Sequence, residues 1–253
     1  MRLRQVALIA HRIEPVAAAL EEVFGLRIAH RDPAVGVFGL ANVVMPVGGD
    51  FLEVLEPLRE DTAGARYLAR RGGDCGYMVI LQDEDALAHR GRIAAAGVRI
   101  IAAGEPGRYR FTHFHPADCA GVLLSIDSVV GEDWRESLSD WPPAGPCWRE
   151  FPSAEGLGIP SVTLQSQDPA GAADRWARLL GRPHEREADG FAIRLDAGVI
   201  RFVGAVDVDG TGVVALDIKV TNPAAALARA RAMSLTIEGG AVLMCGVAIR
   251  PVA

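Results

Sequence analysis

The sequence predicts an α+β fold in which four tandem βαβββ modules form two domains. Three observations support this prediction. Four segments share one order, in which an apolar strand is followed by an acidic or polar turn, an Ala-rich helix and a closing Gly or its substitute. Strand-like sequence follows each of the four helices. A segment rich in Pro and Trp separates the first two repeats from the last two.

The first repeat shows the pattern most fully. Its strand is Val6–Ala10, and its helix is Val16–Phe24. Pro15 suits the first helical turn, where no backbone donor is needed, and Gly25 suits a left-handed residue at the helix end. Three further strands are predicted, with Gly48-Gly49 as a hairpin turn, at Arg27–His30, Val35–Val44 and Asp50–Leu55.

The other three repeats follow the same plan with one departure. Their first strands are predicted at Tyr77–Leu81, Val162–Gln165 and Leu216–Val220. Their helices are predicted from Asp83 to Ala96, from Asp168-Pro169 to Leu180 and from Asn222-Pro223 to Met233. Gly97 and Gly181 close two of these helices, whereas the fourth helix has no closing Gly. In the third repeat, Asp196-Ala197-Gly198 joins two strands as a hairpin, Phe191–Leu195 and Val199–Val203.

These repeats divide the chain into a domain at residues 1–130, a linker at 131–157 and a second, shorter domain at 158–253. The shorter domain requires trimmed strands or a less closed barrel. The linker contains Trp134, Trp141 and Trp148. Because exposed Trp is costly, we expect these side chains to pack back on the domains. A lid over a cleft is the alternative.

Composition excludes several classes of function. Half of the 253 residues are hydrophobic, so a sizeable core can form, and the net charge of -6 argues against general binding of nucleic acid. No apolar run approaches the roughly 20 residues that span a bilayer, and the short run after Met1 is better explained as a strand than as a signal peptide. The four cysteines form no Cys-x-x-Cys pair, which suits free thiols in a reducing cytoplasm. We expect a cytoplasmic protein with a small-molecule partner, and a homodimer stays open.

Two motifs resemble a known superfamily. Phe51-Leu52-Glu53-Val54-Leu55-Glu56-Pro57-Leu58 resembles the last strand of the first module in epimerase-type members of the vicinal oxygen chelate superfamily, which includes glyoxalases, methylmalonyl-CoA epimerases and extradiol dioxygenases. Phe114-His115-Pro116, followed by Gly121-Val122-Leu123-Leu124-Ser125-Ile126, resembles the end of their second module. The likeness covers most of the chain and is clearest in its first half. It implies glyoxalase-like domains, each a half-barrel around a divalent metal that stabilises an enolate-like intermediate.

The resemblance also implies positions for the metal ligands, on the first and last strand of each module. In the first half these positions carry Gln5, Glu53, Gly76 (or Cys75) and Ser125, and in the second half Ser161, Arg201, Ala215 and Arg250. Two of the first four cannot serve in the usual way, and Arg does not ligate metals. We therefore expect no tightly bound metal at this site and no iron site of two His and one carboxylate, while a weakly held divalent cofactor stays open.

Glu53 and a pair of histidines are the candidate catalytic residues. Glu53 shares one strand face with Phe51 and Leu55, where burial would raise its pKa and suit a general base. The alternative is a carboxylate in water at the rim. His113 and His115 would project to one face with Tyr109 and could hold a metal or supply an acid partner to Glu53, although structural or surface histidines are commoner.

The remaining candidates would contact substrate. Gln5 would act as a ligand or polar contact, and His11 would line the cavity mouth unless it is a solvated turn residue. Tyr109 would offer a wall with a hydroxyl donor, or would pack in the core. Arg201 and Arg250 could hold a carboxylate or phosphate, or each could pair with an acidic residue at the domain interface.

Two functions follow from these residues. The first is an isomerase or lyase that acts on a small carbonyl, carboxylic or thioester compound, with its cavity in the first half. The second is a metal-free protein that binds or sequesters a small molecule. The fold alone does not choose between them, because this fold hosts many chemistries.

Overall fold

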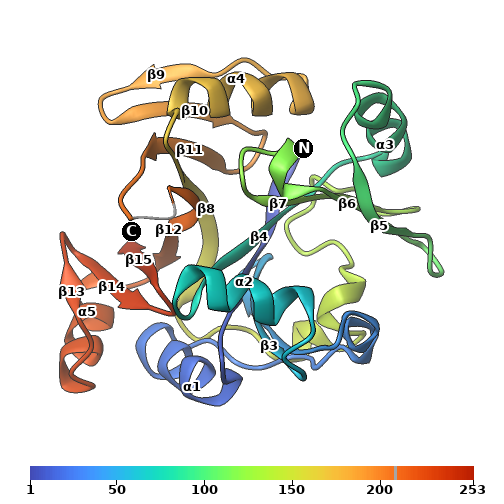
Figure 1. Cartoon of the computed structure of the whole chain (residues 1–253). Helices are drawn as coiled ribbons and strands as arrows, with labels where there is room; N and C mark the ends of the chain where they lie inside the picture. Colours follow the sequence, from blue (N-terminus) through green and yellow to red (C-terminus); the bar gives the residue numbers. More distant parts are fainter. Residues whose placement is uncertain (208–209) are drawn as a thin grey trace.

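The computed structural model describes residues 1–207 and 210–253. The described strands form two mixed sheets, one with seven strands and one with eight. In Figure 1 the first sheet runs from the centre to the right, and the second sheet occupies the left. The predicted α+β fold is therefore confirmed.

The first sheet takes its strands from residues 2–129. The strands are β1 (Arg2–Ile9), β2 (Leu40–Val47), β3 (Asp50–Pro57), β4 (Cys75–Gln82), β5 (Ile100–Gly104), β6 (Tyr109–Phe114) and β7 (Leu123–Val129). Between them lie α1 (Ile13–Phe24), η1 (Pro33–Phe38), α2 (Ala63–Arg71), α3 (Ala86–Ala95) and η2 (Pro116–Asp118). The order across the sheet is β2-β3-β1-β4-β7-β6-β5. β1 runs parallel to β3 and antiparallel to β4, and β4 runs parallel to β7, so the two modules join through β1 and β4.

The second sheet repeats this topology. Its strands are β8 (Gly156–Ser166), β9 (Glu185–Glu187), β10 (Gly190–Arg194), β11 (Val199–Gly204), β12 (Thr211–Val220), β13 (Ile237–Glu238), β14 (Ala241–Met244) and β15 (Val247–Val252), with α4 (Pro169–Leu180) and α5 (Pro223–Ala232) between them. β8 runs parallel to β11 and antiparallel to β12, and β12 runs parallel to β15. Strands β9 and β13 have only three and two residues, which agrees with the prediction of trimmed strands in the shorter half.

The predicted helix boundaries are close to those observed. Helices α4 and α5 begin at Pro169 and Pro223, each after a residue whose side chain caps the first turn. Gly25 and Gly181 take the left-handed conformation, with φ of 64° and 66°. After α5, which lacks a closing Gly, Ser234 adopts a positive φ of 58° instead.

Three sequence predictions need correction. Residues 27–30 form an isolated bridge between His30 and Val44 rather than a strand. The first part of the strand predicted at 35–44 is the 3-10 helix η1, because the Asp32 side chain accepts a hydrogen bond from the Ala34 amide and Pro33 begins a turn. Helix α2 was not predicted, although Thr62 caps its start and Gly72 closes it.

The two sheets pack against each other through a shared core. Val6 and Leu8 of β1 lie in the same buried cluster as Val162 and Leu164 of β8. Glycine allows a close approach: a Cβ added at Gly76 would lie 2.5 Å from the Cβ of Val213 in β12. The opposite face of each sheet, here called the outer face, points away from this core.

The segment between the sheets, residues 130–155, is called the linker from here on. It contains η3 (Pro142–Ala144) and η4 (Trp148–Glu150) and packs on the outer face of the first sheet. Trp134, Trp141 and Trp148 are 6%, 0% and 2% exposed, so the prediction that they pack back is confirmed. The predicted domain boundaries stay a prediction.

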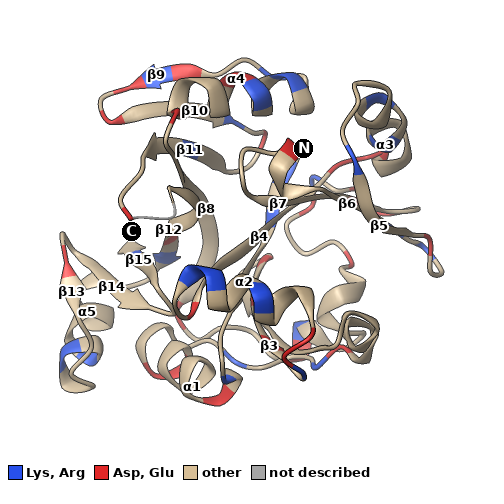
Figure 2. Cartoon of the chain, in the orientation of Figure 1, with Lys and Arg blue, Asp and Glu red and all other residues tan. Residues whose placement is uncertain are grey.

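The surface carries charges of both signs. Figure 2 shows acidic and basic residues interspersed along both halves of the chain, including a basic stretch on α2. None of the helices in residues 1–207 and 210–253 is long and apolar enough to cross a membrane.

Candidate functional site

Glu53 lies on β3, on the outer face of the first sheet. It is 6% exposed and shares this face with Phe51 and Leu55, as the alternation of β3 requires. Its Oε2 accepts a hydrogen bond of 2.7 Å from Gln5 Nε2, and its Oε1 accepts one of 2.6 Å from Asn42 Nδ2. Both carboxylate oxygens are therefore held by amide NH2 groups.

Burial has a strong effect on this carboxyl group. It raises the pKa of Glu53 from 4.5 to about 7, although the hydrogen bonds from Asn42 and Gln5 oppose the shift. A carboxyl group that titrates near neutral pH can both accept and donate a proton under physiological conditions. The burial and raised pKa that the sequence predicted for Glu53 are therefore present, and its role as a base stays a prediction.

A second buried carboxyl group, Asp127, lies on β7 and was missed by the sequence analysis. It is fully buried, and it accepts hydrogen bonds from the Tyr109 hydroxyl at 2.5 Å and from the Ser125 hydroxyl. Burial raises its pKa from 3.8 to about 7 against these hydrogen bonds. The signal in the sequence was an Asp inside the apolar strand Leu123–Val129.

Tyr109 is hydrogen-bonded to one of the two carboxyl groups, Asp127. Burial raises its pKa well above 10, and the charges of Asp127 and Glu53 raise it further. Glu53 and Asp127 thus lie on the last strands of the two modules, β3 and β7, and the phenol of Tyr109 is hydrogen-bonded to Asp127.

The two candidate histidines differ in their surroundings. His113 on β6 packs against Phe38 and Phe111, with ring centroids 6.0 Å and 5.1 Å away. Burial lowers its pKa to about 4, so the imidazole is neutral at neutral pH and suits a contact better than a charged acid. His115 lies beyond the end of β6, where its Nδ1 accepts a hydrogen bond from the Ala117 amide. The structure does not bring His115 to Glu53.

The other predicted contacts are scattered. His11 is exposed and its Nδ1 lies 2.7 Å from Asp74, which fits the alternative of a solvated turn residue. Arg201 and Arg250 lie on the second sheet, where both contact Asp217, at 3.6 Å and 3.5 Å. They pair with a carboxylate, as the alternative expected, but this carboxylate lies between them on their own sheet rather than at an interface.

The donor groups around Glu53 do not fit a divalent metal. The oxygen of Gln5 accepts a hydrogen bond of 2.7 Å from Trp141 Nε1, and both oxygens of Glu53 accept from amides. Within the described residues, no group of three His, Cys, Asp or Glu side chains could hold a metal ion. We therefore derive no chemical step through a metal.

The assignment of Gly76 as a ligand position was wrong. Its missing side chain would face Val213 in the shared core, not the outer face. In the first module, Glu53 of β3 pairs with Ala7 of β1, which lies two residues after Gln5. In the second module, Ser125 of β7 pairs with Ile80 of β4. By the same offset, the counterpart of Gln5 in the second module is Met78.

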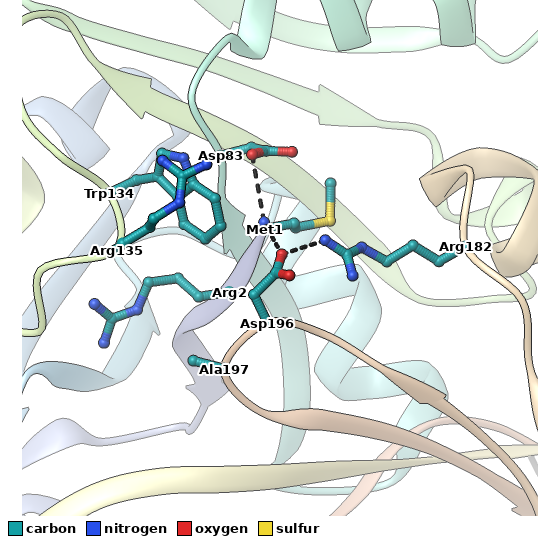
Figure 3. Close-up of a pocket in the computed structure, with 8 residues that line it drawn as sticks. All are labelled: Met1, Arg2, Asp83, Trp134, Arg135, Arg182, Asp196 and Ala197. Carbon is teal, nitrogen blue, oxygen red and sulfur yellow. Dashed lines mark hydrogen bonds and ion pairs between the residues drawn. The ribbon is translucent and has the colours of Figure 1, made fainter.

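A cavity of about 540 Å³ lies between the start of β1, the linker and the β10–β11 hairpin, and neither Glu53 nor Asp127 lines it. Figure 3 shows Asp196 pointing toward the amino group of Met1 and toward Arg182. The amino group also lies 3.4 Å from Asp83. The charged groups of this cavity are largely paired with one another, so we place the candidate site at Glu53.

Comparisons with known proteins agree with the repeat topology. No family model matches the chain. The chain is 28% identical over 134 residues to an ethylmalonyl-CoA/methylmalonyl-CoA epimerase of Cereibacter sphaeroides, and the match covers 51% of this chain and 98% of that protein.

Solved structures give weaker likenesses. A methylmalonyl-CoA epimerase variant of Streptomyces coelicolor in complex with 2-nitronate-propionyl-CoA has a TM-score of 0.47 at 22% identity, covering 52% of this chain and 99% of that one. The methylmalonyl-CoA epimerase of Mycobacterium tuberculosis has a TM-score of 0.46 at 21% identity, covering 51% and 88%. The similarity in sequence and the βαβββ topology together confirm that this chain resembles the epimerase-type members of the vicinal oxygen chelate superfamily.

Proposed function

We propose that this chain is an isomerase that moves a proton on the carbon next to the carbonyl of a coenzyme A thioester. Glu53 and Asp127 would form the proton-transfer pair. The observation that carries the proposal is that each module places one buried carboxyl group on the same sheet face, each with a pKa of about 7. The similarity to a curated ethylmalonyl-CoA/methylmalonyl-CoA epimerase supports the substrate class.

The proposed reaction needs one ionised and one protonated carboxyl group. The ionised group removes the proton, and the electron pair of the broken C–H bond moves onto the thioester carbonyl as an enolate. The protonated group then gives its proton to the opposite face of the same carbon, which inverts the centre. Two groups that both titrate near pH 7 supply this combination, and they return to their starting states by exchanging protons with water.

Gln5 and Asn42 would hold the base in place. Each donates through its NH2 group to one oxygen of Glu53, and these bonds favour the ionised form that the first step needs. Tyr109 would do the same for Asp127 through its hydroxyl. The half-buried aromatic side chains Tyr77 and Phe111 would border the acyl group.

The test is the exchange of substrate hydrogen with solvent. Methylmalonyl-CoA and ethylmalonyl-CoA are incubated with the protein in heavy water, and deuterium at the carbon next to the thioester is followed by mass spectrometry. We expect exchange with the wild type and a loss of about 10²–10⁴-fold in E53Q and in D127N, the usual contribution of general acid–base catalysis. E22Q, which changes an exposed glutamate of α1, serves as the control. Wild-type exchange in E53Q would remove Glu53 from the mechanism.

Two tryptophans of the linker cover the surroundings of Glu53, and this favours a second function. Trp141 and Trp148 bury Phe51 beside Glu53, and both carboxylate oxygens of Glu53 are already hydrogen-bonded. These features suit a protein that binds a small molecule without converting it. Calorimetric binding of the same thioesters without any deuterium uptake would support this function in place of the first.

A further inference from the structure

The linker contributes one residue to the surroundings of Glu53. Trp141 is fully buried, and its Nε1 donates a hydrogen bond of 2.7 Å to Gln5 Oε1. Gln5 Nε2 in turn donates a bond of 2.7 Å to Glu53 Oε2. The indole ring stacks on Phe51 at 6.3 Å and meets the edge of Tyr109 at 5.6 Å, so its position is fixed by packing.

The direction of this chain of hydrogen bonds follows from what each group can do. An amide has a donating NH2 end and an accepting oxygen end, and an indole N–H can only donate. Trp141 therefore selects the orientation in which the Gln5 oxygen points to the indole and the NH2 group points to Glu53. The reversed amide would place an oxygen against the carboxylate and leave two buried donors facing each other.

The other oxygen of Glu53 has a matching arrangement. The Asn42 Oδ1 accepts a hydrogen bond of 2.8 Å from the backbone amide of Asp32, which turns its NH2 group toward Glu53. One amide is thus oriented by the backbone and the other by a side chain. The orientation set by Trp141 can be removed by changing a side chain alone.

We propose that Trp141 is a positioning residue, supplied by the linker, that orients the Gln5 amide and thereby tunes the carboxyl group of Glu53. The Cereibacter sphaeroides relative is almost fully matched by 134 residues, so it is about as long as one sheet of this chain and lacks room for a linker and a second sheet. The catalytic meaning of this role rests on the proposed function, whereas the effect on Glu53 does not.

The test compares two tryptophans that differ in one hydrogen bond. Trp148 is 2% exposed and also packs on Phe51, yet its Nε1 has no hydrogen-bond partner among the described residues. W141F removes the bond to Gln5, and W148F removes an unbonded N–H from a similar environment. The pKa of Glu53 is measured in both variants and in the wild type by carbon-13 NMR of its carboxyl group.

We expect W141F to raise the pKa of Glu53 by about one pH unit, the equivalent of a tenfold loss of the ionised form below the pKa. W148F should leave it unchanged. If the thioester exchange occurs, the pH at which kcat/KM rises with the ionisation of Glu53 should move upward by the same amount in W141F alone, with KM little changed. Equal pKa values in W141F and W148F would overturn the proposal.

Two measurements keep the test decisive if W141F does not fold. Q5M keeps the Trp141 side chain but removes the donor to Glu53, and should raise the pKa of Glu53. In the wild type, the nitrogen-15 signal of the Trp141 indole should shift as Glu53 titrates, whereas that of Trp148 should not. A Trp141 signal that ignores the titration would contradict the proposal. Absence of thioester exchange would defeat the proposed function alone, because the NMR titrations need no substrate.

Discussion

Replacing Glu53 with Gln should change how the stability of the protein depends on pH. Burial raises the pKa of Glu53 from 4.5 to about 7 in the folded state. Between these values the folded protein holds the proton that the unfolded chain releases, so stability is greatest below pH 4.5 and is lost as pH rises through 7. Between pH 5 and pH 8 the loss amounts to about 2–3 kcal/mol, because a tenfold change in an equilibrium constant corresponds to roughly 1.4 kcal/mol.

E53Q cannot ionise and should not show this loss. Its overall stability will differ from the wild type, because the Gln side chain turns one accepting oxygen into a donor that faces Gln5 or Asn42. The diagnostic quantity is therefore the change between pH 5 and pH 8, since Asp127 and all other groups are common to both proteins.

The assay is urea unfolding at pH 5, 6, 7 and 8, followed by circular dichroism, with the free energy of unfolding extrapolated to water. The wild type should lose about 2–3 kcal/mol more than E53Q over this range. Parallel curves for the two proteins would show that Glu53 ionises in the folded state as it does in the unfolded chain, and would refute the reasoning from burial.

Three further predictions concern other features. Burial lowers the pKa of His113 to about 4, so the neutral imidazole contributes stability above pH 6.5, and the wild type should lose at most about 3 kcal/mol of this as pH falls toward 4. H113Q should lack this loss, which unfolding at pH 7 and pH 4.5 will show. G76A should destabilise the fold by about 2–4 kcal/mol, because its Cβ would press on Val213. The control G91A in α3 meets no atom and should stabilise the fold by up to about 1 kcal/mol. Thermal melts in which both variants match the wild type would contradict the packing of the two sheets. Treatment with a chelator should leave both the melting temperature and the thioester exchange unchanged, because the oxygens of Gln5 and Glu53 are already engaged; a loss of either that added metal restores would contradict the engaged donor set.

Much of the fold could be predicted from local signals. The starts of α4 and α5, the left-handed Gly25 and Gly181, and the strands that begin each module follow from capping residues and apolar patterns that act within a few residues. Residues 35–38 were misassigned because Val35, Val37 and Phe38 are residue types that strands favour, and only the cap by Asp32 decides for a 3-10 helix.

The candidate site was predicted in part. The alternation of β3 placed Glu53 on one face with Phe51, because side chains in a strand alternate between faces whatever surrounds the strand. Asp127 was hidden, because an isolated Asp in an apolar strand carries no local sign of the tyrosine that binds it.

The sequence by itself determined which elements form and which side chains share a strand face, because both depend on neighbours along the chain. Only the tertiary structure decided which strands' side chains meet. Irregularities in the pairing of β1 with β4 shift the register near Gln5 and Ala7, so Gly76 turns to the shared core and Met78 takes the place expected of it. The contact of Trp141 with Gln5 joins residues 136 positions apart, and packing across that separation leaves no periodic mark on either segment.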